Sequence, residues 1–353
     1  MKEKHLYILA GVFVFLLIIQ FVTKPRHTSV NLDDFVQSIL IGVSRDDVRN
    51  IEIYKQIAGK EALQMQFARV EDKWFIPTYF NCKAQKSRID QLLDNLIEMT
   101  GKVRSSDPKH FEKYLISDEQ GIHLILKDEA DKPLANLILG KKGEDANTGF
   151  VRFGGKEKVY FVDKNILSQL GIYGEIDTVS VFKYSSFVDL QAVDENEVNY
   201  AMVGLVANGK QMVLKKNEKQ VEVTNADSTK STKTEYEWVL LEGRMKEKAL
   251  DKKEVANFFR DVTKIRGTEI VDRIGNTLGD LNKSARYGFS RASNQIVFVD
   301  AENNQKNIIF GKEYEKDKGY YMNIREDGLI YKVSKSTYDK IFKWMEDLPK
   351  KKV

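Results

Sequence analysis

The spacing of apolar and polar residues changes along the chain, and each spacing predicts a different kind of element. Residues 6–22 are apolar throughout except for Gln20, and they carry no charge. Beyond residue 47, apolar residues alternate with polar ones in short runs, as is typical of half-buried β-strands. Stretches with apolar residues at every third or fourth position interrupt these runs and indicate amphipathic helices. The pattern predicts an α+β chain that follows one long apolar segment.

The apolar segment, from Leu6 to Val22, has the length of a short membrane-spanning helix. A helix rises about 1.5 Å per residue and needs roughly 17 to 25 apolar residues to cross a bilayer core. Lys2 and Lys4 precede the segment, but no Ala-x-Ala pattern follows it, which favours an uncleaved anchor over a cleaved signal or a buried soluble helix. Long C-terminal domains are translocated largely regardless of charge. We predict a cytoplasmic tail at residues 1–5, a transmembrane anchor at 6–22 and the remaining chain outside the cytoplasm.

Residues 23–44 are predicted to be a connector, and the first α+β module follows at residues 45–173. Alternation predicts an opening strand pair, and Trp74-Phe75-Ile76 predicts a third, short strand that ends before Pro77. Apolar residues recur at helical spacing from Ser87 onward, as expected for a helix with one buried face. That face consists of Ile89, Leu92, Leu93, Leu96 and Ile97.

The rest of the first module is predicted to be a strand meander that ends in a short helix. Gly101 is expected to close the first helix, and Gly140-Lys141-Lys142-Gly143 is expected to end the second strand of the meander. A turn at Gly154-Gly155-Lys156 joins the last two strands. A short helix runs from Asp163 to Gly171. The four strands of the meander are predicted at residues 123–127, 134–139, 150–153 and 159–162.

The second half of the chain, at residues 177–346, repeats this order. Trp238-Val239-Leu240 corresponds to Trp74-Phe75-Ile76, and a helix from Asp251, closed by Gly267, follows it. The apolar positions of the two helices differ by one constant shift of about 166 residues, which indicates internal duplication. The other matches are Tyr287-Gly288-Phe289 with Tyr114-Leu115-Ile116, residues 308–312 with 137–141, Gly319-Tyr320-Tyr321 with Gly149-Phe150-Val151, and residues 330–333 with 159–162.

Three segments of the second half depart from the first. Residues 225–234 are rich in Ser, Thr, Lys and Asp, and they predict a mobile hairpin tip rather than a site. The final helix, from Ser334, is longer than its counterpart. Residues 347–353 form a basic tail.

This pattern resembles the bacterial family known as domain of unknown function 4340. The features that carry the resemblance are the N-terminal anchor, the Lys73-Trp74-Phe75 strand before a helix, and the Tyr287-Gly288-Phe289 step. Strands that end in Leu139-Gly140 and Phe310-Gly311 add to it, as do a Gly-aromatic strand and a Val-Tyr-x-Val strand. The first module departs from the family at Tyr114-Leu115, where Gly is usual.

The resemblance implies a role rather than a chemistry. Family members are similar to companions of gliding-motility-type ABC transporter components. The resemblance therefore implies a membrane-anchored envelope accessory protein, held by a single pass in the bacterial inner membrane, with transporter subunits as protein partners. It implies no enzyme activity and supplies no catalytic residues.

Charge and cysteine content narrow the possible partners. The chain has 56 Lys and Arg against 52 Asp and Glu, for a net charge of +4. The one basic cluster is Lys350-Lys351-Lys352 at the C-terminus, so the sequence predicts no nucleic-acid partner. A single cysteine, Cys82, excludes an internal disulfide and a Cys-based zinc site.

No catalytic, cofactor or metal motif is present in the sequence. The four histidines lack ligand spacing, and no phosphate-binding loop or Gly-x-Ser-x-Gly elbow occurs. His123 and Cys82 are interpreted as structural residues. The carboxylates of Asp46-Asp47 and Glu195-Asn196-Glu197 precede strands and suit solvated turns. A glycosidase pair stays open as an alternative, because its two acids need not be close in the chain.

Aromatic residues supply the candidate partner surface. Trp74 and Trp238 occupy equivalent strand ends, which favours core packing for both. Tyr320 and Tyr321 are consecutive strand residues and must face opposite ways. Together with Trp344 on the last helix, they are the predicted partner patch.

The sequence thus predicts a membrane-anchored, extracytoplasmic accessory protein of an ABC-type transporter, without cofactors. One alternative is an envelope hydrolase that acts on glycans in a cleft between the modules. Another is a passive envelope scaffold. The sequence does not identify a small-molecule ligand.

Overall fold

The computed structural model describes residues 36–176, 179, 182–193, 200–224, 230–243, 246–274 and 281–348. The predicted cytoplasmic tail, the anchor at 6–22, residues 23–35 of the connector and residues 349–353 of the basic tail lie outside this part. No helix within the described ranges is long and apolar enough to cross a membrane. The predicted anchor therefore stays a prediction.

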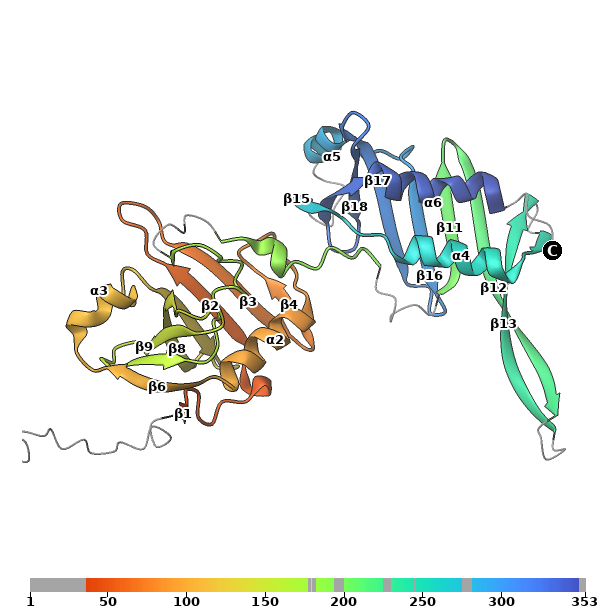
Figure 1. Cartoon of the computed structure of the whole chain (residues 1–353). Helices are drawn as coiled ribbons and strands as arrows, with labels where there is room; N and C mark the ends of the chain where they lie inside the picture. The colour runs from red at the N-terminus through yellow and green to blue at the C-terminus, as the bar shows by residue number, and fades with distance from the viewer. Residues whose placement is uncertain are drawn as a thin grey trace, which may run out of the picture.

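Two antiparallel sheets form most of the described structure, with a few helices beside them (Figure 1). The first sheet has ten strands and the second has nine. This is the α+β fold in two modules that the alternating and helical patterns predict.

The first sheet consists of β1 (Gln37–Ser38), β2 (Asn50–Lys55), β3 (Leu63–Val70), β4 (Lys73–Ile76), β5 (Cys82–Lys83), β6 (Thr100–Ser105), β7 (Ile122–Lys127), β8 (Pro133–Lys142), β9 (Gly149–Phe153) and β10 (Val159–Val162). Its helical segments are η2 (Arg45–Asp47), α2 (Lys86–Ile97), η3 (Pro108–His110) and α3 (Phe111–Tyr114), and η5 (Tyr184–Ser186) follows between the modules. The second sheet consists of β11 (Tyr200–Ala207), β12 (Lys210–Thr224), β13 (Lys230–Glu242), β14 (Lys246–Ala249), β15 (Glu269–Arg273), β16 (Gln295–Asp300), β17 (Gln305–Glu315), β18 (Gly319–Ile324) and β19 (Leu329–Ser334). Its helices are α4 (Lys252–Thr263), α5 (Leu281–Tyr287) and α6 (Lys335–Asp347).

The strand order is the same in both sheets. The first runs β6-β10-β9-β8-β7-β2-β3-β4-β5, with β1 added beside β6, and the second runs β15-β19-β18-β17-β16-β11-β12-β13-β14. Every strand of the second sheet therefore takes the place of one strand of the first. Helix α2 connects β5 to β6, and α4 connects the equivalent strands β14 and β15. One shared order of this length is the relationship that the sequence repeat predicts.

A close backbone approach recurs in both modules. A Cβ at Gly140 would lie 2.5 Å from the carbonyl oxygen of Tyr114, and a Cβ at Gly311 would lie 2.2 Å from that of Tyr287. The residue after each tyrosine is left-handed, with φ of 52° at Leu115 and 75° at Gly288. The first module departs from the family pattern at Leu115, where Gly is usual. The turn is nevertheless the same, because Leu115 has a left-handed φ as Gly288 does in the second module.

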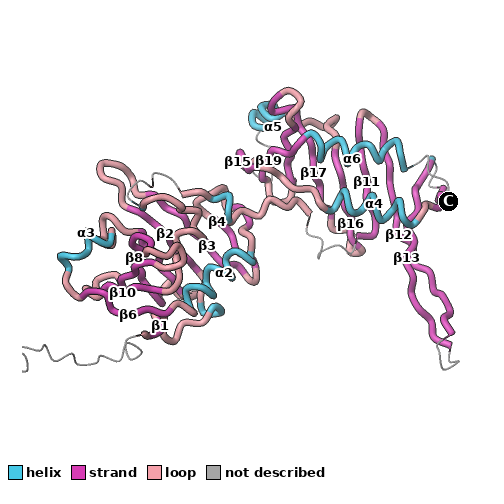
Figure 2. The backbone as a smooth tube through the Cα atoms, in the orientation of Figure 1, coloured by secondary structure: helices cyan, strands magenta, loops and turns pink. Residues whose placement is uncertain are grey.

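The helices α2 and α4 cover equivalent positions of the two cores. Asp251 caps α4, since its side chain accepts hydrogen bonds from the backbone amides of Lys253 and Glu254. In the second module α4 and α6 lie beside each other over one face of the sheet (Figure 2). The buried residues of α2 are Ile89, Leu92, Leu93 and Leu96, and those of α4 are Val255, Phe258 and Val262.

Two glycines that were predicted to close these helices have another role. Helix α2 ends at Ile97, and Gly101 lies within β6, where a Cβ would meet the Val162 side chain at 2.8 Å. A Cβ at Gly267 would meet the ring of Tyr331 at 2.7 Å. The absence of a side chain at both positions permits close packing against a neighbouring strand rather than a helix cap.

The end of the first module also differs from the prediction. Asp163 to Gly171 forms successive turns instead of a helix, with backbone bonds from Gln169 to Ile166 and from Gly171 to Ser168. One bond of α-helical span, from Leu170 to Ile166 at 3.3 Å, occurs among them, and no longer α-helical run follows from it. The apolar residues of this segment, Ile166, Leu167 and Leu170, are nevertheless buried.

Strand β8 continues through the glycine that was predicted to end it. The strand reaches Lys142, and its pairing with β9 shifts register between Leu139 and Lys142. Such a bulge lets the strand bend without ending. The register also corrects one sequence match: Val151 pairs with Leu139 as Met322 pairs with Phe310. Phe150 is therefore the counterpart of Tyr321, not of Tyr320.

Strands β12 and β13 extend into a long two-stranded ribbon (Figure 1). They span 15 and 13 residues, against 8 and 4 in the equivalent strands β3 and β4. Pairing continues out to Thr224 and Lys230, so the two strands form a hairpin, but residues 230–234, predicted to belong to its irregular tip, are part of β13. Residues 225–229 lie outside the described residues.

Candidate functional site

A cavity of about 810 Å³ opens at one end of the first sheet, between the β2–β3 loop and the loop before β7. Tyr54 and His123 contribute aromatic walls, Asp118 and Glu119 contribute carboxylates, and Ile57 is part of the apolar lining. The volume falls within the roughly 300 to 1,000 Å³ that is common for ligand sites. We refer to this space as the Tyr54–His123 cavity.

The two rings of this cavity face each other because of the strand register. Tyr54 in β2 pairs directly with His123 in β7, and directly opposed residues in antiparallel strands project from the same face. The ring centroids lie 4.3 Å apart with an interplanar angle of 10°. The imidazole is only 5% exposed.

The hydrogen bonds of His123 define its tautomer. Nε2 lies 2.8 Å from the backbone carbonyl oxygen of Asp118, which can only accept, so Nε2 carries the proton. Nδ1 is buried and has no hydrogen-bond partner among the described residues. A buried acceptor without a partner costs about 1–3 kcal/mol. The residue lines the cavity, and its unused acceptor is enclosed in the cavity wall.

Arg152 in β9 holds the loop that closes this side of the cavity. Its guanidinium is 2% exposed and donates from Nε to the carbonyl of Ile116 at 3.0 Å. One terminal nitrogen donates to the carbonyl of Lys156 at 3.1 Å, and the other lies 3.1 Å from a carboxylate oxygen of Asp118. The ring of Phe111 lies 4.5 Å from the guanidinium carbon. Two carbonyls, a ring and the Asp118 carboxylate thus surround this buried charge, although within the described part of the chain Nη2 has the ion pair to Asp118 and no hydrogen bond.

The second module does not repeat the two rings. Strand pairing places Val206 and Gln295 where Tyr54 and His123 lie in the first module. A two-residue turn, Asn208-Gly209, replaces the longer β2–β3 loop. The shared fold consequently does not need the stacked rings or the unused acceptor.

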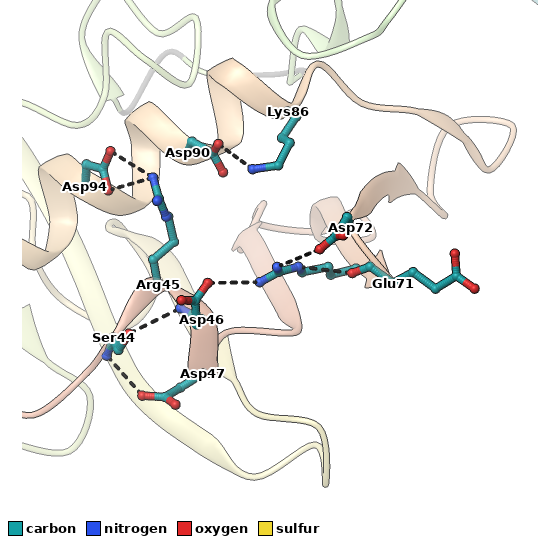
Figure 3. A network of polar contacts seen from close by, with 10 residues as sticks. Ser44, Arg45, Asp46, Asp47, Glu71, Asp72, Lys86, Asp90 and Asp94 are labelled. Carbon is teal, nitrogen blue, oxygen red and sulfur yellow. Dashed lines mark hydrogen bonds and ion pairs between the residues drawn. The ribbon is translucent and has the colours of Figure 1, made fainter. Parts of the chain in front are cut away.

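A polar network closes the outer end of α2 in the first module (Figure 3). Arg45 in η2 pairs with Asp94 of α2 at 3.3 Å, and Asp46 lies 3.7 Å from Arg69 of β3. Ser44 caps η2 by accepting from the backbone amide of Asp46 at 3.3 Å. The carboxylates at Asp46-Asp47, which were expected in a solvated turn, thus belong to a network that links η2 to α2 and β3.

The corresponding end of α4 in the second module borders a groove of about 460 Å³. The rings of Trp238 and Phe259, whose centroids lie 4.5 Å apart, belong to its lining together with Lys216 and Arg260. The predicted turn carboxylates at Glu195-Asn196-Glu197 lie outside the described residues.

The two tryptophans at equivalent strand ends differ in burial. Trp74 is 2% exposed in the core of the first module, as the core-packing interpretation predicts. Trp238 is only partly buried. Module duplication has therefore preserved the position of the ring but not its environment.

The structure places Tyr320, Tyr321 and Trp344 in different surroundings, all partly buried. Tyr320 stacks on Tyr338 of α6 at 3.9 Å, whereas Tyr321 lies on the other face of β18, against Tyr287 at 4.8 Å. The indole of Trp344 donates to a carboxylate oxygen of α4 at 3.1 Å. Because the two tyrosines face opposite ways, the three residues do not form one continuous surface.

A connecting segment, residues 182–193, joins the two modules by backbone pairing. Val188 bridges to Ala84 beyond β5, and Gln191 bridges to Arg266 ahead of β15. Phe187 packs its ring 4.9 Å from that of Phe67 in the first core. The segment thus contributes to both modules, and we call the contact region between them the seam.

The seam encloses a small polar cavity of about 120 Å³, lined in part by Lys83, Asp189, Asp327 and Tyr331. Burial raises the pKa of Asp327 to about 6 and also raises that of Tyr331. Cys82 is fully buried beside these groups, and burial raises the pKa of its thiol to about 12. The volume is well below the roughly 300 Å³ at which ligand pockets usually begin. A larger cavity of about 550 Å³ at the seam has Asp72, Asp189 and Arg266 in its lining, so the glycan-hydrolase alternative stays a prediction.

Potential metal ligands do not gather anywhere in the described ranges. No group of three or more His, Cys, Asp or Glu residues there could hold a metal ion. Sequence patterns missed the partners of His123, because these are Asp118, in the loop five residues upstream, and Tyr54 in β2. Only the strand register reveals that they meet.

The described architecture defines a class of tandem-module proteins in which one antiparallel α+β unit occurs twice. The family model for a domain of unknown function (DUF4340) matches residues 74–278, more than half of the 353-residue chain. The chain belongs to this family, as its sequence resemblance predicts. No curated protein and no solved structure matches the chain.

Proposed function

We propose that this chain is a non-catalytic accessory protein of the bacterial cell envelope. In this proposal the apolar segment at residues 6–22 spans the inner membrane once, and both modules lie outside the cytoplasm. The modules bind protein partners, among them subunits of an ABC-type transporter. The family resemblance and the apolar segment support the location, and the β12–β13 ribbon supports the binding role.

The β12–β13 ribbon is the observation that best supports a binding role, because it extends the shared fold without adding to the core. Residues from Lys230 to Tyr236 of β13 are all exposed, and Tyr236 is 53% exposed. The ammonium of Lys216 lies 4.3 Å from the centroid of the Tyr236 ring. An isolated two-stranded ribbon is marginally stable in water, and an exposed strand edge can pair with another chain. The ribbon is therefore the proposed partner contact.

Co-purification in mild detergent tests the transporter association. The full-length chain is expected to retrieve transporter subunits repeatedly. Recovery of the chain alone, in repeated preparations at low detergent, would overturn the proposed association and leave the passive-scaffold alternative.

A ribbon deletion tests the contact itself. Glu218 and Tyr236 are paired residues, so Asn-Gly can replace residues 219–235 between them. We expect the amount of transporter subunits that co-purify with this variant to fall at least tenfold. A matched control replaces residues 144–147, between Gly143 and Thr148, with Asn-Gly and should retrieve as much as the full-length chain. Equal retrieval by both variants would exclude the ribbon as the contact.

A topology reporter tests the location independently. A fusion after Val353 to an enzyme that is active only outside the cytoplasm should be active. A second fusion, to a reporter active only in the cytoplasm, should be inactive. The reverse pattern would overturn the extracytoplasmic placement.

A further inference from the structure

We propose that the Tyr54–His123 cavity of the first module binds an organic cation, specifically the guanidinium group of an arginine side chain. The inference concerns a different site from the ribbon and does not rest on the transporter association. It follows from four observations on the acceptor, the ring wall, the carboxylates and the comparison between modules.

The first observation is the unused acceptor of His123. Its Nε2 proton is committed to the carbonyl of Asp118, so Nδ1 can only accept a hydrogen bond in the neutral ring. The nitrogen is enclosed in the cavity wall in this structure, so an N–H donor of a ligand reaches it only when the Tyr54 ring or the Asp118 loop moves aside. Leaving such a buried acceptor unpaired costs stability, which the ligand would restore.

The second observation is the flat ring wall. The Tyr54 ring is stacked on His123 through one face and is partly exposed. A planar guanidinium stacks on an aromatic face and donates in its own plane at the same time. A compact ammonium has no such plane, and this difference favours arginine over lysine.

The third observation is the negative charge beside the rings. Glu119 is an exposed carboxylate of the lining, and Asp118 joins it although Arg152 already pairs with Asp118. Burial raises the pKa of Tyr54, and the carboxylates of Asp118 and Glu52 raise it further. Asp118 is already paired with Arg152 and Glu52 with Lys127, so Glu119 is left as the main partner for an added cation.

A lysine also lines the cavity but leaves the strand on the other face. Lys55 follows Tyr54 in β2 and is 5% exposed, on the side of the buried residues Ile51 and Ile53. Its side chain therefore begins across the sheet from the stacked rings.

The fourth observation separates ligand binding from folding. The second module builds the same strand order with Val206 and Gln295 at the ring positions. A fold that forms without the rings, the acceptor and the long loop does not require them. Because no three metal ligands gather in the described part of the chain, an organic cation is a better match than a metal ion.

The direct test is titration of the full-length chain in detergent with N-acetyl-arginine methylamide, followed by calorimetry and by NMR of the His123 ring. The neutral isostere N-acetyl-citrulline methylamide should bind at least tenfold more weakly. The diamine putrescine distinguishes a side-chain guanidinium from a free small cation, and it should also bind at least tenfold more weakly than the arginine derivative. Equal binding of the citrulline compound would overturn the proposal, and tighter binding of putrescine would overturn the choice of arginine.

Three variants locate the site. His123→Phe keeps a ring but removes the acceptor, and Glu119→Gln removes the charge from an exposed position; each should weaken arginine binding at least fivefold. Glu129→Gln, an exposed change in the β7–β8 turn of the same module, is the matched control and should leave binding unchanged. If Glu119→Gln and Glu129→Gln bind equally well, the cation is not bound at this cavity.

Discussion

Arg273 of the second module donates from Nε to the backbone carbonyl of Phe80 in the first module at 2.8 Å. A terminal nitrogen of the same guanidinium donates to the carbonyl of Asn81 at 3.1 Å. Phe80 and Asn81 are both left-handed, with φ of 55° and 47°, a conformation that costs roughly 1–2 kcal/mol per residue outside glycine. At the seam, one arginine of the second module thus donates both of these hydrogen bonds to a strained turn of the first.

Replacement of Arg273 should weaken the seam. Hydrogen bonds from a charged donor contribute roughly 1.5–3 kcal/mol, so Arg273→Ala is expected to lower the free energy of unfolding by about 2 kcal/mol. Urea denaturation followed by tryptophan fluorescence measures the change. Arg325→Ala, at an exposed arginine of the same module, is the control and should stay within about 0.5 kcal/mol of the parent. Equal losses in the two variants would contradict the role assigned to Arg273.

The seam also contains a carboxyl group with an unusual titration, Asp327. Asp327 accepts a hydrogen bond from the backbone amide of Leu329 at 2.8 Å, and its hydroxyl neighbour Tyr331 lies 3.4 Å away. Burial raises the pKa of Asp327 from 3.8 to about 6, against the opposing effects of that amide and of the Lys306 and Arg273 charges. Cys82 and Asp189 also lie near this group.

This shift predicts a loss of stability as pH rises. The folded chain keeps the Asp327 proton up to about pH 6, whereas the unfolded chain releases it near pH 4. Between these values the unfolded state binds fewer protons, so stability falls as pH increases. A shift of roughly two units at about 1.4 kcal/mol each corresponds to about 3 kcal/mol.

Asp327→Asn should remove this dependence. The stability of the variant relative to the parent is expected to rise by up to about 3 kcal/mol between pH 4 and pH 7 and to be constant above it. Urea denaturation at several pH values provides the measurement. Asp317→Asn, at an exposed turn position, should change stability equally at all these pH values. A relative stability of Asp327→Asn that does not vary with pH would disprove the assignment.

Sequence patterns predict the strands and helices of this fold well where burial on one face sets the period. The alternation in β2 and the helical spacing in α2 both match a buried face in the structure. The segment from Asp163 fails as a helix because its apolar residues are buried by turns, and spacing alone does not separate the two. The prediction of Gly101 as a helix cap fails because glycine is needed there for another reason. A larger residue would collide with Val162, which lies about sixty residues away in the chain.

The candidate site was beyond prediction for a related reason. His123 lies in an alternating run and is indistinguishable there from a structural residue. His123 becomes a candidate site residue only through Tyr54 on the neighbouring strand and through the loop that Arg152 of β9 contacts. These partners come together only when the register of β2, β7, β8 and β9 is fixed. The internal repeat, in contrast, required no contact information, because the order of matches already contains it.

The repeat leads to a last prediction, on the turn after Tyr287. Gly288 has φ of 75°, and a Cβ there would lie 2.8 Å from the backbone nitrogen of Lys312. Gly209 has the same φ of 75°, but a Cβ there would meet nothing within 4 Å. The two glycines share the same left-handed φ and differ in the space around them.

Alanine substitution at both positions separates the two effects. Gly209→Ala should cost only the left-handed conformation, roughly 1 kcal/mol. Gly288→Ala adds a contact with backbone that cannot rotate away, so we expect a total loss of about 2–4 kcal/mol in the free energy of unfolding. Thermal and urea denaturation of both variants measure the difference. Equal losses would show that the turn after Tyr287 can shift away from β17, and that the close approach shared with Leu115 and Gly140 is not a rigid requirement of the module.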